Sequence, residues 1–166
     1  MAVQTAMIFV RQGKAYLPVM ALTEHGVLIG IEPVHTADLT LEALLIALEK
    51  VSSAGHPRIP HPTREEWRYL SRRDPILRAA GVKSWRAFSQ YSVVYTIGWT
   101  EQAVVIYISH LDHLGRTDYA SAKKLTFPRD APFRTIVEAI LKDIRSRPEL
   151  QTDNSKAQSS PHISQY

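Results

Sequence analysis

The stretch Ser92-Val-Val-Tyr-Thr-Ile-Gly-Trp-Thr-Glu-Gln-Ala-Val-Val-Ile-Tyr-Ile-Ser109 decides the fold class, because it has the pattern of a β-hairpin. β-Branched and aromatic residues fill two runs, 92–99 and 102–109, and Thr100-Glu101 joins them. After a loop over 110–118, a third strand is expected over 119–127. We therefore expect antiparallel strands in this half of the chain.

A helix is expected to follow these strands. Pro128 ends the third strand, and Pro132 can occupy the first turn of a helix. An apolar stripe of helical spacing then follows, at Val137, Ile140, Leu141 and Ile144. Arg145, Arg147 and Pro148 close this helix.

The first half of the chain has the same outline. Short apolar runs predict strands over 6–10, 15–22 and 27–31, with turns at Gly13-Lys14 and Glu24-His25-Gly26 and a stop at Pro33. A helix should follow, because Asp38 and Thr40 offer N-cap oxygens and Gly55 a C-terminal cap. Its stripe is Leu41, Leu44, Leu45 and Leu48.

These two outlines predict an α+β fold made of antiparallel β-units, each followed by an amphipathic helix. Glu-Ala-Leu-Leu at 42–45 and Glu-Ala-Ile-Leu at 138–141 occupy the same place in the two stripes, so a pseudo-duplication is one interpretation. The other is that any two amphipathic helices after strands look alike. We expect one domain over 1–150, with halves 1–55 and 91–148, and a flexible polar tail over 151–166.

Composition excludes several classes of protein. The 166 residues are 45% hydrophobic and 22% charged, which suits a globular core and excludes a disordered or collagenous chain. Without cysteine there is no disulfide framework and no thiol nucleophile. The opening residues lack a targeting signal and a membrane-spanning run, so a soluble cytoplasmic protein with no membrane partner is expected.

The net charge of +4 comes from one segment. Residues 57–90 carry eight basic and three acidic side chains, whereas residues 1–56 have a net charge of −2. This basic segment opens with a proline-rich, extended connector over 56–62, in which His56 and His61 are interpreted as exposed loop histidines. A helix from Arg64 to about Arg73 should follow, begun by a capping box of Thr63 and Glu66. Shorter helical stretches are expected at 75–80 and, as one of two alternatives, at 83–88.

The basic helix carries the strongest candidate for a binding surface. Arg64, Arg68 and Arg72 recur every four residues and line one face, with Trp67 beside them and Arg73 completing the turn. Arginine forks bind phosphates or carboxylates, and nearby aromatic side chains stack on bases or anchor protein interfaces. The alternative is that Trp67 packs inward and the arginines form a solvated face.

The sequence gives little support to catalysis. His110-Leu-Asp-His113 could bind a divalent metal, but strand alternation separates the two imidazoles, and a polar loop is the simpler interpretation. There is no Walker loop, dinucleotide fingerprint or nucleophile elbow. We therefore expect no enzyme, no catalytic residue, no cofactor and no metal.

The segment Gly81-Val-Lys-Ser-Trp-Arg-Ala-Phe88, followed by two strands and a late amphipathic helix, resembles immunity proteins of bacterial contact-dependent growth-inhibition and related polymorphic toxin systems. The resemblance covers about residues 75–147. It implies a small cytosolic protein that binds one cognate toxin domain and blocks its active site or substrate path. Many such toxins are basic nucleases, so an acidic patch near the first helix is a second candidate surface, made of Glu32, Asp38, Glu42 and Glu49.

A second resemblance is architectural. Two successive units of strands followed by a helix look like the Whirly type of single-stranded DNA-binding fold. The alternative function is therefore single-stranded nucleic-acid binding through Arg64, Trp67, Arg68 and Arg72 in the basic segment, although no nucleic-acid motif accompanies it.

Overall fold

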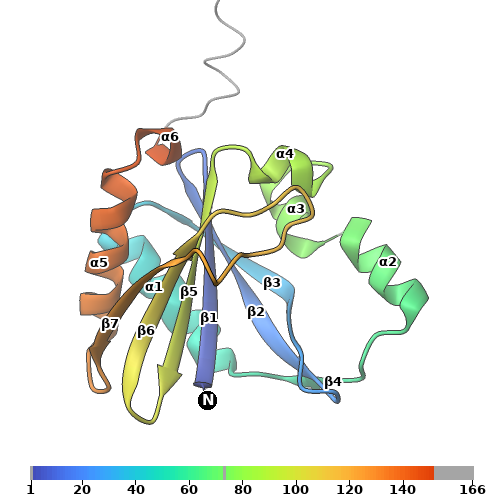
Figure 1. The fold of residues 1–166 in the computed structure, drawn as a ribbon, viewed down its shortest axis with the longest axis horizontal. Helices are drawn as coiled ribbons and strands as arrows, with labels where there is room; N and C mark the ends of the chain where they lie inside the picture. The colour runs from blue at the N-terminus through green and yellow to red at the C-terminus, as the bar shows by residue number, and fades with distance from the viewer. Residues whose placement is uncertain (1, 73, 152–166) are drawn as a thin grey trace, which may run out of the picture.

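The computed structural model describes residues 2–72 and 74–151, and these form a seven-stranded sheet and six helices (Figure 1). The strands are β1 (Ala2–Arg11), β2 (Lys14–Thr23), β3 (Leu28–Asp38), β4 (Arg58–Ile59), β5 (Ser92–Thr100), β6 (Ala103–Ser109) and β7 (Lys123–Pro128). The helices are α1 (Leu41–Ala54), α2 (Arg64–Arg72), α3 (Pro75–Ala80), α4 (Trp85–Ser89), α5 (Phe133–Arg145) and α6 (Pro148–Gln151). The expected α+β class is confirmed. No helix in these ranges is long and apolar enough to cross a bilayer.

The sheet joins both halves of the chain. Its order is β3-β2-β1-β5-β6-β7, with antiparallel neighbours throughout, and the short β4 pairs in parallel with β2. The two first strands, β1 and β5, lie side by side at the centre over a long register from Ala2↔Thr100 to Arg11↔Ser92. Each half therefore runs outward from the centre as a three-stranded meander.

The two long helices cover the same face of the sheet. The N-cap side chain of α1 is Thr40, whose Oγ1 accepts a hydrogen bond from the Ala43 N–H (3.2 Å), and Gly55 ends the helix with φ 65°. The apolar stripes of α1 and α5 pack on alternate residues of the strands, as strand and helix periodicity require. The resulting main core is fully buried at its centre, for example at Ile8, Leu17, Leu48, Ile106 and Ile140.

The opposite face carries a smaller hydrophobic cluster beneath α3, α4 and the loop between β6 and β7. Phe88 of α4 is fully buried and meets Phe9 and Tyr16 edge-on, with ring centroids 6.2 and 6.1 Å away. Trp85 packs at the margin of this cluster, 5.5 Å from Phe88. The segment 83–88 therefore contains the start of α4 and forms a helical turn, and α4 covers this face of the sheet.

Strands β1 and β2 separate soon after the turn that joins them (Figure 1). Their pairing ends at Phe9↔Tyr16, and Pro18, which has no N–H to donate to a ladder, follows two residues later. Beyond the split, His56 bridges the strands: Nδ1 donates to the Met20 carbonyl (2.8 Å), and Nε2 accepts from the Thr5 N–H (3.1 Å). His56 is half-buried, so its interpretation as an exposed loop residue is wrong.

Strand β3 does not stop at Pro33, as the sequence led us to expect. It continues to Asp38, and the ladder with β2 passes from Val19↔Ile31 to Pro18↔Val34, leaving Glu32 and Pro33 outside the register. The Glu32–Pro33 bond is cis. Because β3 lies at the sheet edge, a proline in this irregularity removes no hydrogen bond from the interior.

Two boundaries near the C-terminal end also differ from expectation. β7 begins at Lys123 rather than Tyr119, because Asp118 holds a turn by accepting from the Ala120 N–H (3.1 Å) and the Ser121 hydroxyl (2.7 Å). Pro148 begins α6 instead of only ending the previous helix, and Gln151 belongs to α6. The remainder of the expected tail, 152–166, lies outside the described residues.

Candidate partner-binding surfaces

The basic helix α2 forms as the capping box predicts. The Thr63 hydroxyl accepts from the Glu66 N–H, and the Glu66 carboxylate accepts from the Thr63 N–H, both at 3.2 Å. The helix stands away from the sheet, at the far side of the molecule from α5 (Figure 1). No residue described in α2 belongs to either hydrophobic cluster. The body of the protein therefore does not depend on α2 for its core.

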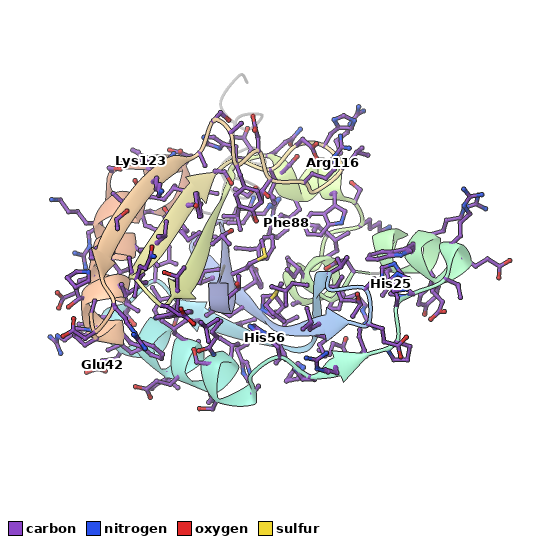
Figure 2. The ribbon with its side chains drawn as sticks, turned by 60° about the horizontal axis from the view of Figure 1, so that its bottom comes forward. His25, Glu42, His56, Phe88, Arg116 and Lys123 are labelled. Carbon is purple, nitrogen blue, oxygen red and sulfur yellow. The ribbon has the colours of Figure 1, made fainter. Side chains whose placement is uncertain are left out.

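An aromatic stack attaches α2 to the body. Trp67 is half-buried and meets the ring of His61 edge-on at 5.7 Å, and His61 stacks on His25 with centroids 4.0 Å apart (Figure 2 labels His25). His61 Nδ1 lies 3.0 Å from the hydroxyl of the buried Thr23. The stack depends on the parallel pairing of β4 with β2, so sequence spacing gave no sign of it. His61, like His56, was wrongly interpreted as an exposed loop histidine.

The structure describes part of the expected arginine stripe. Arg64 and Arg68 are exposed and lie one helical turn apart, and Tyr69 is 57% exposed beside them. Arg72 is the last residue of α2, whereas Arg73 lies outside the described residues. Trp67 is half-buried against His61, whereas the neighbouring Arg64 and Arg68 are exposed.

The four acidic candidates do not form one patch. Glu32 pairs with Arg78 of α3 (2.5 Å), and Asp38 pairs with Lys14 of β2 (2.6 Å). Glu42 and Glu49 share the outer face of α1, seven residues apart, with the 54% exposed Ile46 between them. The acidic surface is thus narrower than expected and lies on the other side of the sheet from the β6–β7 loop, as Glu42 and Arg116 show in Figure 2.

The His110-Leu-Asp-His113 string forms a loop. Asp112 accepts from the Leu114 and Arg116 N–H groups and from Arg116 Nε, each at 2.9 Å, and these bonds outweigh desolvation to hold the pKa of its carboxyl below the usual range. His110 Nδ1 contacts the Ser92 carbonyl at 3.3 Å. Within the described part of the chain, no three histidine or acidic side chains are grouped to hold a metal.

This loop borders a polar pocket of about 460 Å³ that the sequence did not indicate. Its lining includes Ser109, whose buried hydroxyl has no hydrogen-bond partner among the described residues. Its wall includes Lys123 and Arg147, both of which pair with Asp143. The lining carries two acidic side chains, Asp112 and Asp118, and three basic ones, Arg116, Lys123 and Arg147, so its charge favours no single class of ligand.

Asp74 is the most perturbed carboxyl among the described side chains. It caps α3 by accepting from the Ile76 N–H (2.9 Å). Burial raises the pKa of Asp74 to about 6, against the opposing effects of that hydrogen bond and of Arg78. The folded state therefore binds a proton more tightly than the unfolded chain does.

This shift predicts that stability falls as the pH rises between about 4 and 6. The sign follows because the folded protein holds the Asp74 proton over this range while the unfolded chain has lost it. The loss by pH 7 should be about 2 to 3 kcal/mol. Asp74→Asn keeps the cap acceptor but cannot ionise. The free energy of unfolding of this variant, measured with urea, should therefore fall much less over this pH range than that of the wild type. An unchanged decline in Asp74→Asn would contradict the assignment.

Comparisons with known proteins show the fold alone. No protein-family model matches the sequence, and no curated protein matches it. Among solved structures, the chain is similar to a protein of unknown function, NMB0488, from Neisseria meningitidis, with a TM-score of 0.56 and 16% identity. The match covers 87% of this chain and 94% of that one. The same arrangement of strands and helices thus occurs over nearly the whole of both proteins.

Proposed function

We propose that this chain is a non-catalytic immunity protein that binds a cognate bacterial toxin domain in the cytoplasm and occludes its active site. The observation that carries the proposal is α2. This helix stands off the body, is attached to it by Trp67 on His61, and has Arg64, Arg68 and Tyr69 exposed.

The composition of α2 fits a protein partner. Arginine, tyrosine and tryptophan are the residue types that contribute most to protein–protein binding energy. Anchoring Trp67 reduces the entropy lost when the helix is captured, because the helix already has a fixed base. A helix outside both hydrophobic clusters is free to vary with the partner without disturbing the fold.

The outer face of α1 is a second contact surface in this proposal. Glu42 and Glu49 flank the exposed Ile46, so the face combines one apolar contact with two negative charges. Such a face complements a basic toxin domain, and its charges raise the association rate more than the final affinity.

Single-stranded nucleic-acid binding is the alternative, and it uses the same arginines. The charge of α2 makes it the weaker candidate. Glu65 and Glu66 lie in its first turn and offset two of its three arginines, which leaves little attraction for a phosphate backbone.

We also propose that β1-β2-β3-α1 and β5-β6-β7-α5 are pseudo-equivalent units. Both are meanders that lead to an amphipathic helix on the same sheet face. The antiparallel pairing of their first strands, β1 and β5, is what a twofold relation between the units requires.

Substituting Arg68 with glutamate tests the role of α2. We expect Arg68→Glu to weaken binding to the toxin domain encoded beside this gene by about tenfold or more, and to reduce protection of cells that express the toxin. Arg129→Glu makes the same charge change at an exposed residue between β7 and α5 and should leave both unchanged.

Calorimetry and a growth assay measure the two effects. A neighbouring gene that encodes no toxin domain would contradict the immunity function. If Arg68→Glu and Arg129→Glu weaken toxin binding and protection equally, the cause is a general charge effect and not a contact made by α2. Binding to a single-stranded oligonucleotide, falling steeply between 50 and 200 mM salt, would favour the alternative.

A further inference from the structure

The split between β1 and β2 contains a cavity of about 170 Å³ on the face opposite the long helices. The two separating strands form its floor, and α3, Trp85 and Gly115 lie above them. Its apolar lining residues are Met7, Phe9, Pro18, Met20, Leu28, Ile76 and Trp85. Gly30 and Gly115 contribute backbone, and Asp74 is the one titratable residue among the described residues of the lining.

Asp74 has spare hydrogen-bonding capacity in this apolar setting. Its carboxylate accepts one hydrogen bond from the described residues, through Oδ1 from the Ile76 N–H. Arg78, one turn further along α3, offsets part of the effect of burial on the pKa of Asp74, but its guanidinium is paired with Glu32 at 2.5 Å. Among the described residues Asp74 forms no ion pair, and a carboxylate at an apolar cavity is stabilised by a cation.

We propose that this cavity binds an ammonium group carried on a short apolar stem, with Asp74 as its counter-ion. The volume fits such a group, because an apolar cavity of about 150 Å³ accommodates a benzene-sized guest. The thioethers of Met7 and Met20 adapt to an alkyl chain, and the indole of Trp85 attracts a cation. An alkylammonium ion satisfies the apolar wall and the carboxylate together.

Other classes of ligand would leave either the carboxylate of Asp74 or the apolar wall of the cavity without a favourable contact. A neutral hydrocarbon leaves Asp74 without a partner, and an anion is repelled by it. A divalent metal needs several oxygen or nitrogen ligands, whereas the described lining offers one carboxylate. The ammonium group can belong to a free amine or to a lysine side chain of a bound protein, since both present the same chemistry.

Titration with n-butylammonium, followed by NMR of the Trp85 indole and the Met7 and Met20 methyl groups, tests the site. We expect saturable shifts with a Kd on the order of 1 mM, and at least about tenfold weaker binding of n-butanol, which has a similar stem without the charge. Asp74→Asn, which keeps the cap acceptor, should bind the two compounds equally. Equal binding of both compounds by the wild-type protein, or no saturable shift, would overturn the proposal.

A second measurement needs no variant. Binding of n-butylammonium should strengthen as the pH rises from 5 to 7, because Asp74 ionises there while the amine stays protonated. The charged groups described near Asp74 are the paired Arg78 and Glu32. A pH-independent affinity would contradict the role of Asp74. N-acetyl-lysine methylamide distinguishes the sources: shifts at the same residues indicate that a partner's lysine can enter, whereas binding of the free amine alone indicates a small-molecule ligand.

Discussion

Replacing Gly115 with alanine is expected to lower the free energy of unfolding by about 2 to 4 kcal/mol. A methyl group at this position would lie 2.7 Å from Trp85 Cγ and Cε2 and closer still to Cδ2. The backbone also has φ +79°, a conformation that alanine adopts at a penalty. The indole must then move, and with it the packing between α4 and Phe9.

Gly26 supplies the matched control. It has φ +81°, nearly the same as Gly115, but no atom lies within 4 Å of the position that a methyl group would take. Gly26→Ala should therefore lower the free energy of unfolding by only about 1 kcal/mol, which is the cost of the backbone conformation alone. Chemical denaturation of both variants separates the two contributions.

A second substitution identifies the contact responsible. In a Trp85→Leu background, Gly115→Ala should lower the free energy of unfolding by no more than Gly26→Ala does. The leucine at position 85 is smaller than the indole and leaves room for the new methyl group. If the loss stays at 2 to 4 kcal/mol in that background, the close approach of Trp85 is not its cause.

Local signals in the sequence predicted much of the fold. Thr40 caps α1, and Thr63 with Glu66 starts α2, because these hydrogen bonds join residues three apart. Pro33 misled the prediction of β3, because the tolerance of a strand for proline depends on whether the strand lies at an edge. That position becomes known only when all the strands are arranged in the sheet.

The candidate site was predicted only in part for the same reason. The exposed face of α2 follows from helical spacing, as does the shared face of Glu42 and Glu49. The contact of His61 with Thr23 and the pairing of Glu32 with Arg78 join residues 38 and 46 apart in the sequence. Such contacts leave no local pattern, so the sequence could not show that Glu32 and Asp38 are neutralised by basic neighbours.

Asp143→Ala is expected to lower the free energy of unfolding by about 3 kcal/mol, because Asp143 is the centre of a buried polar network. Its Oδ2 accepts from the Tyr95 hydroxyl (2.7 Å) and from Arg147 Nε (2.8 Å), and Lys123 Nζ lies 3.6 Å from Oδ1. Tyr95 is fully buried, so without Asp143 its hydroxyl loses the acceptor and cannot turn to water. Asp130→Ala, at an exposed turn, should change stability by less than about 0.5 kcal/mol.

The pH dependence of this loss tests the network further. Burial pushes the pKa of the Asp143 carboxyl up, but hydrogen bonds from Tyr95 and Arg147 outweigh burial and hold that pKa below its usual range. The carboxylate therefore stabilises the fold above about pH 4, and this contribution disappears as the pH falls through its folded-state pKa. The difference between wild type and Asp143→Ala, measured by urea unfolding, should shrink as the pH falls from 6 to 3. A difference that stays constant with pH would mean that the loss of stability comes from packing. A double-mutant cycle of Tyr95→Phe and Asp143→Ala tests the hydrogen bond between the two side chains. A coupling energy of zero would exclude that bond as the source of the loss.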